Sequence, residues 1–447
     1  MTTQTPPGQR PPRPRGRANN LRWGMAVLCF FGLSVNYVDR SALSVALPSM
    51  NSELGLDPGA QGLILGTFFL AYAVFQLPAG VLIDRIGVKR SFALGAVVWG
   101  LATMLTGLVG GLLALLVFRF LLGIGESTGY PGSAKVVSRW FPRHERAFAN
   151  SIWDNGARAG TAVAMPVVTA IIAWEGWRAA FVVVGLLALV WVVWWWRAYR
   201  EPAEHPKLSE QELAYITEGG ARGESTSDDA PRVRWRELFG YRTVWAMMLG
   251  FFCLNYIIFF FITWFPSYLV QARGFGLLEL GTVGAIPGIV AILGSLAGGW
   301  VSDRLVGSGW SLTKARKVCL IPGMLLSSVI ALAVVVPNAT WALVLLSVSY
   351  ASLAFSAASV ASLPADVAPE PGQVSSLAGI QNCASNIAGF IGPIVTGFLQ
   401  TATGGSFVAP LVLSGALGLL GAFAYGVLIR RVEPLPIGNA VREESPA

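Results

Sequence analysis

The sequence is short of the residues that a soluble protein needs at its surface. Only 13% of its 447 residues are charged, whereas 54% are hydrophobic, and it has just two histidines. Soluble domains have roughly a quarter of their residues charged, so this composition excludes an ordinary soluble globule. The histidines, His144 and His205, both fall in polar loops. The sequence therefore predicts neither a metal site nor the catalytic constellation of a membrane-embedded enzyme.

Cysteine is scarce as well. The four cysteines, Cys29, Cys253, Cys319 and Cys383, all fall inside apolar segments. This setting does not suit a structural disulfide or a cysteine-based metal motif, both of which favour loops. We expect all four to be buried as small apolar side chains.

What the chain has in abundance is long apolar segments. A segment of about 20 apolar residues can cross a hydrocarbon layer of roughly 30 Å as a helix, and twelve such segments lie between Trp23 and Arg430. We therefore expect an all-α membrane protein with twelve transmembrane helices. The expected spans lie near residues 22–48, 60–82, 90–109, 112–134, 147–171, 178–198, 243–271, 279–303, 316–336, 341–364, 374–400 and 406–430.

A polar stretch divides these segments into two sets of six. We expect residues 199–242 to form a cytoplasmic linker between an N-terminal half, residues 22–198, and a C-terminal half, residues 243–431. Residues 1–21 and 432–447 are then cytoplasmic tails, and the Pro- and Arg-rich first tail is expected to be disordered.

The basic residues indicate how the chain crosses the membrane. All but five of the 32 Lys and Arg residues lie in segments that this topology places on one side. Because Lys and Arg collect on the cytoplasmic side, we expect a multi-pass protein of the bacterial inner membrane with both termini in the cytoplasm. The net charge of +8 then follows from topology and from contact with the lipid bilayer, so no nucleic-acid partner is expected.

A short motif follows the second segment of each half. In GVLIDRIGVKR (residues 80–90) and GWVSDRL (residues 299–305), a glycine stands four residues before Asp-Arg. Such a repeat is expected when two halves are related by an axis along the membrane normal. The glycine allows close helix contact and the aspartate can accept hydrogen bonds at a neighbouring helix end; the alternative is a plain charged turn. The predicted cytoplasmic gate residues are Gly80, Asp84, Arg85, Arg90, Asp303 and Arg304.

Ionisable residues inside the apolar segments are the main functional candidates, because each costs about 2.5–3.5 kcal/mol at the centre of a bilayer. NYVDR carries Asp39 and Arg40, and RFLLGIGE carries Arg119 and Glu126. With a rise of 1.5 Å per residue, the two arginines fall at similar depth and Glu126 lies roughly 10 Å deeper.

This set of charges suits the binding of an anion together with protons. Paired guanidinium groups can each grip a carboxylate with a planar fork. Asp39 and Glu126 are the expected proton carriers, because a substrate that engages an arginine changes the balance of charge around its internal acid. The alternative is a static ion-pair network that only orients helices.

Further polar residues fall near the middle of other segments. Tyr72, Asn255, Tyr256 and Asn386 can contact a hydroxylated ligand or hydrogen-bond between helices. Arg158 is either a third substrate-binding cation or a side chain that extends along the cavity wall.

The motif at residues 80–90 resembles the signature loop of the major facilitator superfamily. NYVDR, FFLAYAVFQLPAG, RFLLGIGESTGYPG, WFPRHERA and ITWFPSYLVQARGF are together similar to the anion:cation symporter family within that superfamily, over nearly the whole chain. The resemblance implies a fold of two six-helix halves and a secondary transporter, acting as a monomer, that imports a small organic carboxylate with protons by alternating access. Protons are the coupling ion, and no cofactor is expected.

The resemblance also implies roles for individual residues. By motif position, Asp39 and Glu126 match the family's protonatable pair, and Arg40 and Arg119 match its paired arginines. Pocket positions of the family are matched by Tyr37, Tyr72 and Asn386.

The substrates implied are sugar acids such as hexuronates, aldonates and glucarate. Galactonate carriers have a glutamine on the fifth helix where this chain has Ala157 followed by Arg158. This difference disfavours galactonate and leaves open a simpler or aromatic carboxylate.

Other functions fit less well. An organophosphate:phosphate antiporter is expected to have an arginine on the seventh helix, and the chain has none between Val244 and Gln271. A membrane sensor or enzyme would need a soluble domain or a catalytic cluster. A channel would not explain the repeated Asp-Arg loops.

Overall fold

The computed structural model describes residues 20–142, 145–219, 235–369 and 374–436, and within these ranges every regular element is a helix. Eleven of the described helices are long and apolar enough to cross a membrane. The N-terminal half comprises α1 (Leu21–Leu54), α2 (Pro58–Ile86), α3 (Val88–Thr106), α4 (Leu112–Glu126), α5 (Gly129–Trp140) and α6 (Arg146–Ala198).

Helix α6 provides two of the predicted crossings. At Gly176 the backbone leaves the helical conformation with φ 82° and ψ 171°, which glycine adopts readily because it has no Cβ. Next to this break, Arg178 forms an ion pair with Glu53 at the end of α1. Just past the end of α6, by contrast, Glu201 forms an ion pair with Arg139 of α5. The chain therefore reverses at Gly176, and the twelve predicted crossings are confirmed.

The linker and the C-terminal half consist of more and shorter helices than the N-terminal half. The linker contains η1 (Pro202–Glu204), α7 (Glu210–Glu218) and α8 (Trp235–Leu238). The helices of the C-terminal half are α9 (Arg242–Thr263), α10 (Phe265–Arg273), α11 (Leu277–Thr282), η2 (Val283–Ala285), α12 (Ile286–Gly307), α13 (Leu312–Ser327), η3 (Ser328–Val334), α14 (Ala339–Val367), α15 (Val374–Ala402), α16 (Val408–Phe423) and η5 (Ala424–Leu428).

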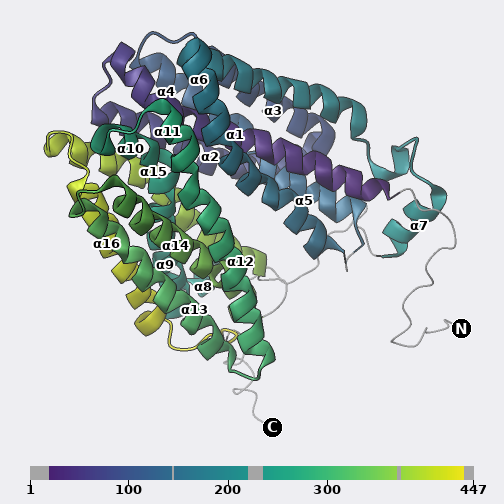
Figure 1. The fold of residues 1–447 in the computed structure, drawn as a ribbon. Coiled ribbons are helices and arrows are strands. Elements are labelled where there is room, and N and C mark those ends of the chain that lie inside the picture. Colours follow the sequence, from purple (N-terminus) through teal and green to yellow (C-terminus); the bar gives the residue numbers. More distant parts are fainter. Residues whose placement is uncertain (1–19, 143–144, 220–234, 370–373, 437–447) are drawn as a thin grey trace, which may run out of the picture.

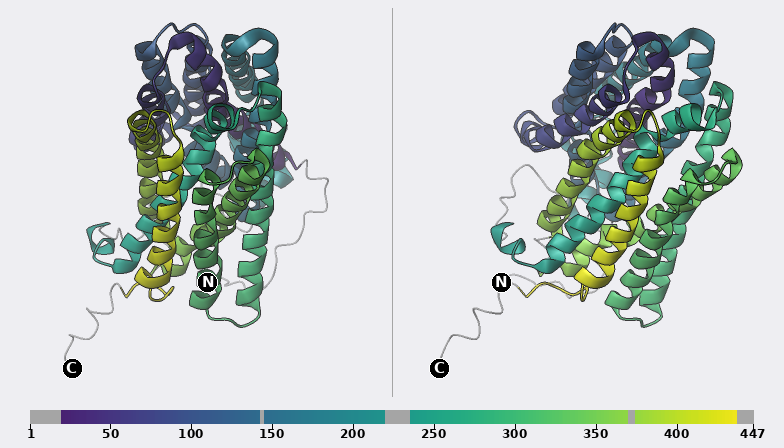
Figure 2. Two further views of the ribbon diagram at one scale, coloured as in Figure 1. Left: turned by 60° about the vertical axis from the view of Figure 1, so that its left-hand side comes forward. Right: turned by 90° about the vertical axis from the view of Figure 1, so that its left-hand side faces the viewer.

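The two halves form two helical bundles that meet at one end and diverge toward the other (Figures 1 and 2). We call the end that contains Gly55 and Gly176 the distal end, and the opposite end, where the linker helices lie, the linker end. The bundles are held together by α2 against α15, α1 against α10, and α6 against α11. At Gly62 of α2 an added Cβ would lie 2.5 Å from the Pro393 carbonyl oxygen of α15. Glycine therefore permits a close approach of the two halves at this point.

The prediction that all cysteines are buried is wrong at one position. Cys29, Cys253 and Cys319 are buried, but Cys383 is exposed. The adjacent Asn382 is also exposed and lines a cavity.

Candidate functional site

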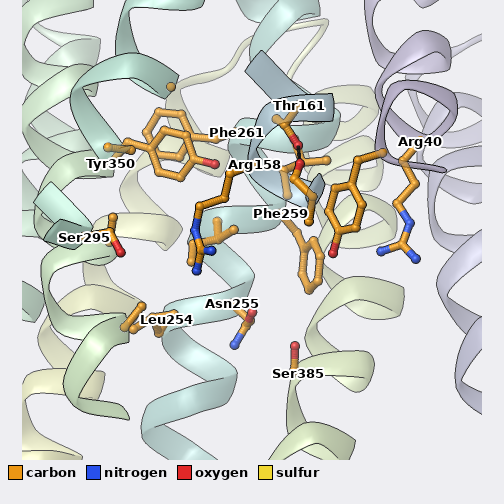
Figure 3. A pocket seen from close by; sticks show the side chains of 18 of the residues that line it. Arg40, Arg158, Thr161, Leu254, Asn255, Phe259, Phe261, Ser295, Tyr350 and Ser385 are labelled. Atoms are coloured by element: carbon orange, nitrogen blue, oxygen red, sulfur yellow. Dashed lines mark hydrogen bonds between the residues drawn. The ribbon is translucent and has the colours of Figure 1, made fainter. Parts of the chain in front are cut away.

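A cavity of about 770 Å³ lies between the two halves. Its wall includes residues of α1, α2, α5 and α6 on one side and of α9, α12, α14 and α15 on the other (Figure 3). This volume lies within the range of small-molecule sites.

The charge on the cavity wall is unevenly distributed. All charged side chains among the lining residues, namely Arg40, Asp154 and Arg158, come from the N-terminal half. The C-terminal half contributes uncharged groups. Its lining polar residues are Asn255, Ser295, Tyr350, Gln381, Asn382, Ser385 and Asn386. The cavity thus has a cationic side suited to an acid group and an amide- and hydroxyl-bearing side suited to hydroxyls.

Arg40 is the cation on the α1 side of the cavity. Its Nε donates a 2.7 Å hydrogen bond to the Glu126 carboxylate, whose side chain is fully buried. The guanidinium group lies 4.6–4.8 Å from the ring centroids of Tyr37, Phe68 and Tyr72. Its Nη2 has no hydrogen-bond partner. Arg40 is therefore held in position by Glu126 and three aromatic rings while it lines the cavity.

Three of the predicted intramembrane charges lie behind Arg40 and do not line the cavity. Asp39, Arg119 and Glu126 are each at most 4% exposed. Asp39 lies near Arg119 and Glu126, but neither of its carboxylate oxygens has a hydrogen-bond partner. Both acids are thus close to the arginine that lines the cavity and are themselves buried.

The predicted depths of these groups need correction. The helical rise put Glu126 deeper than the two arginines, whereas Glu126 is in direct contact with Arg40. The long arginine side chain spans the difference in backbone height. Arg119, predicted to share the substrate with Arg40, stacks over Phe68 at 5.2 Å and is 4% exposed.

A second charged cluster lines the cavity on α5 and α6. Arg158 Nη1 donates to Asp154 Oδ2 at 3.0 Å. Asp154 Oδ1 accepts from the Tyr130 hydroxyl at 3.2 Å, and the Tyr130 and Tyr37 hydroxyls are 3.3 Å apart. The chain of contacts reaches Arg40 through the Tyr37 ring. Sequence reasoning missed Tyr130 and Asp154, although Asp154 stands four residues before Arg158, which is the spacing of a helical ion pair.

The other predicted binding residues divide into two groups. Tyr37, Tyr72, Arg158, Asn255 and Asn386 line the cavity. Tyr256 is not among the lining residues; it is 3% exposed and its ring lies against Gly392 of α15.

Comparison with known proteins agrees with this architecture. Residues 29–379 match the model of the Major Facilitator Superfamily. The chain belongs to the major facilitator superfamily. It is 35% identical to the probable galactarate/D-glucarate transporter GudP of Bacillus subtilis (strain 168), with 93% of each chain covered. It is also 35% identical to the probable L-galactonate transporter of Escherichia coli (strain K12), covering 93% of this chain and 91% of that one.

Solved structures show the same fold. The chain aligns with the inward-facing, unoccupied crystal structure of a bacterial homologue of the human lysosomal transporter Spinster with a TM-score of 0.70. The alignment covers 93% of this chain and 94% of that one at 20% identity. This major facilitator is therefore a transporter and not an enzyme.

The first predicted gate loop of this major facilitator forms a contact between helices. Asp84 pairs with Lys135 of α5 at 2.9 Å, but the two side chains are 66% and 36% exposed. Arg85 and Arg90 are exposed as well. The close helix contact predicted at Gly80 is wrong, because an added Cβ there would meet nothing within 4 Å.

The second gate loop differs from the first. Asp303 and Arg304 are exposed, and Arg304 lies over the Trp300 ring at 5.3 Å. The ion pair of this half is instead Arg316 with Asp366, at 2.7 Å. Arg316 also donates to the buried Ser302, the residue before Asp303. Arg316 of α13 thus contacts the motif from the neighbouring helix, and Asp366 was not among the predicted gate residues.

Proposed function

We propose that this transporter imports a sugar acid together with protons through the bacterial inner membrane by alternating access. The observation that carries the proposal is Arg40, a cation on the cavity wall that is paired from behind with the buried Glu126. The names of the two relatives, galactarate/D-glucarate and L-galactonate transporters, support a sugar acid as the substrate. Amide and hydroxyl side chains on the opposite wall can hydrogen-bond its hydroxyl groups.

Proton coupling follows from competition for Arg40. A substrate carboxylate that takes the guanidinium group leaves Glu126 without its partner. A buried carboxylate without a partner is costly, and binding a proton removes that cost. Asp39, which is buried without a hydrogen-bond partner, is the neighbouring acid that can exchange this proton.

The proposed orientation places the linker end, and both chain termini, in the cytoplasm. The halves meet at the distal end and diverge toward the linker end (Figure 1), so this structure corresponds to a state open to the cytoplasm. Arg40 and the cavity around it remain at the centre while one half rocks against the other. We expect the protein to act as a monomer, since one chain supplies both walls of the cavity.

An aromatic carboxylate is the second candidate substrate. The cavity is lined by five aromatic side chains of the C-terminal half, Phe251, Phe259, Phe261, Phe265 and Tyr350. The rings of Phe261 and Tyr350 stack with centroids 4.4 Å apart, and they offer a flat apolar surface to an aromatic ligand.

Transport in proteoliposomes tests the proposal. We expect an inside-alkaline pH gradient to drive accumulation of a sugar acid, and preloaded substrate to accelerate uptake by counterflow. Arg40→Lys keeps a charge beside Glu126 but loses the planar fork, so we expect it to raise the KM about tenfold. Accumulation without any dependence on the pH gradient would contradict proton coupling, and selective uptake of aromatic acids would favour the second candidate.

A further inference from the structure

The cavity has two cations, and the proposed site uses only one. Arg40 holds the acid group of the substrate, whereas Arg158 on α6 pairs with Asp154 one helical turn away. We call Arg158, Asp154 and Tyr130 the Arg158 subsite. In Figure 3, Arg158 and Arg40 both project from the N-terminal half into the same cavity, with Asn255 nearby.

The Arg158 pair is open to exchange with a ligand. Its two side chains are 48% and 38% exposed, while those of the Arg40–Glu126 pair are 9% and 0% exposed. Exposed ion pairs are weak and are broken at little cost, whereas buried ones are not. Asp154 also has a second partner, the Tyr130 hydroxyl, which can satisfy its carboxylate when Arg158 turns to a ligand.

We propose that the Arg158 subsite binds the second acidic group of a dianionic sugar acid whose first carboxylate is held by Arg40. This proposal rests on the proposed function and narrows it to substrates with an acid group at each end, such as an aldarate. Each guanidinium group can grip one carboxylate with two hydrogen bonds.

The distribution of charge explains why two acid groups fit better than one. Arg40 and Arg158 are the two cations among the lining residues, and Asp154 is the only acid among them. When a monoacid binds, Arg158 stays paired with Asp154 and contributes no binding energy to the ligand. A dianion gains a second charge-assisted contact, while the hydroxyls between its ends face the uncharged wall. Arg158 would therefore determine specificity between diacids and monoacids.

Binding to the purified, detergent-solubilised protein tests this proposal. Galactarate and galactonate share a six-carbon chain and differ in the second carboxylate, so the ratio of their affinities, measured by calorimetry, reports the subsite. We expect the wild type to bind galactarate at least tenfold more tightly than galactonate, and Arg158→Gln to reduce this ratio about tenfold. Asp154→Asn removes the competing acid and should raise galactarate affinity several-fold.

Arg178→Gln is the matched control. Arg178 is also on α6, is similarly exposed and pairs with an acid, but is not among the lining residues of the cavity. We expect it to keep the wild-type ratio, with each variant melting within a few degrees of the wild type. Equal affinities of the wild type for both acids, or an unchanged ratio in Arg158→Gln, would overturn the subsite while leaving the Arg40 site intact. Binding of neither acid would instead overturn the proposed function.

Discussion

At the scale of single residues, the Arg40–Glu126 ion pair joins the cavity wall to the buried interior of the N-terminal half. Arg40 faces the cavity, whereas Glu126 and Asp39 lie behind it and are each 1% exposed. A ligand that binds Arg40 would engage the direct partner of Glu126. Under the proposed function, the protonation of Glu126 therefore depends on what Arg40 binds.

A neutral side chain at position 126 should uncouple protons from substrate. Glu126→Gln resembles the protonated acid and cannot release a proton, so we expect counterflow to persist while accumulation driven by a pH gradient is lost. Proteoliposome uptake with and without the gradient measures both. Glu175→Gln, at an exposed position of the distal end, should behave as the wild type. Retained pH-driven accumulation in Glu126→Gln would show that Glu126 is not a coupling group.

The sequence pointed to part of this site for a clear physical reason. Charges are expensive in a lipid-facing helix, so Asp39, Arg40, Arg119 and Glu126 stood out as candidates. The sequence could not predict that Arg119 does not line the cavity, because its position depends on side-chain rotamers and on the packing around Phe68.

At the scale of helices, the first turn of α1 depends on the linker. The residue before α1, Asn20, makes no side-chain capping bond. The buried carboxylate of Glu212 on α7 accepts instead from the backbone N–H groups of Leu21 and Arg22. It also pairs with the Arg22 guanidinium group at 3.0 Å. A linker residue thus accepts hydrogen bonds from N–H groups that would otherwise be free at the start of α1. Its negative charge also interacts favourably with the positive end of the helix dipole.

Loss of this cap should release the linker. Glu212→Ala leaves two helix N–H groups without their acceptor, which costs roughly 1–2 kcal/mol for the cap alone. Arg22 loses one of its two acidic partners and keeps Glu145. We expect faster hydrogen exchange at residues 21–24 and faster proteolysis within 199–219. Glu210→Ala, on the exposed side of the same helix, should change neither, and equal effects of the two variants would argue against the cap.

Two of the ion pairs at the linker end, Arg316–Asp366 and Lys135–Asp84, should differ in strength. Arg316 and Asp366 are 11% and 14% exposed, and removing one partner of a buried pair costs about 3 kcal/mol or more. Arg316→Ala should therefore lower the melting temperature by several degrees. Lys135→Ala breaks the exposed pair with Asp84 and should cost less than about 1 kcal/mol. Equal shifts in melting temperature would show that burial does not set their contributions.

The helices themselves were largely predictable, whereas the contacts at their ends were not. Apolar runs fix where a chain can cross lipid, so the predicted crossings, such as residues 60–82 within α2, fall on the observed helices. The pair of Arg316 with Asp366 joins residues 50 positions apart. It depends on which helix ends become neighbours, and apolar periodicity carries no such information.

At the scale of the whole molecule, the contact between α2 and α15, which we call the distal seam, joins the two halves at the distal end. A Cβ added at Gly62 would lie 2.5 Å from the Pro393 carbonyl oxygen, and one at Gly66 would lie 2.8 Å from the Phe390 carbonyl oxygen. Both obstacles are backbone atoms of the opposite half, which side-chain motion cannot remove. A side chain here must therefore push the halves apart at the distal end.

Gly62→Ala should shift the population toward the state that is open at the distal end. If the added Cβ raises the free energy of the closed state by about 1.4 kcal/mol, the ratio of the two states changes tenfold. Positions 84 and 304 are exposed on opposite halves at the linker end. Spin labels attached there in a cysteine-free background should lie closer together in Gly62→Ala than in the wild type, as measured by pulsed electron paramagnetic resonance. Gly299→Ala, where an added Cβ meets nothing within 4 Å, should keep the wild-type distances. Unchanged distances in Gly62→Ala would mean that this seam does not control the opening of the cavity.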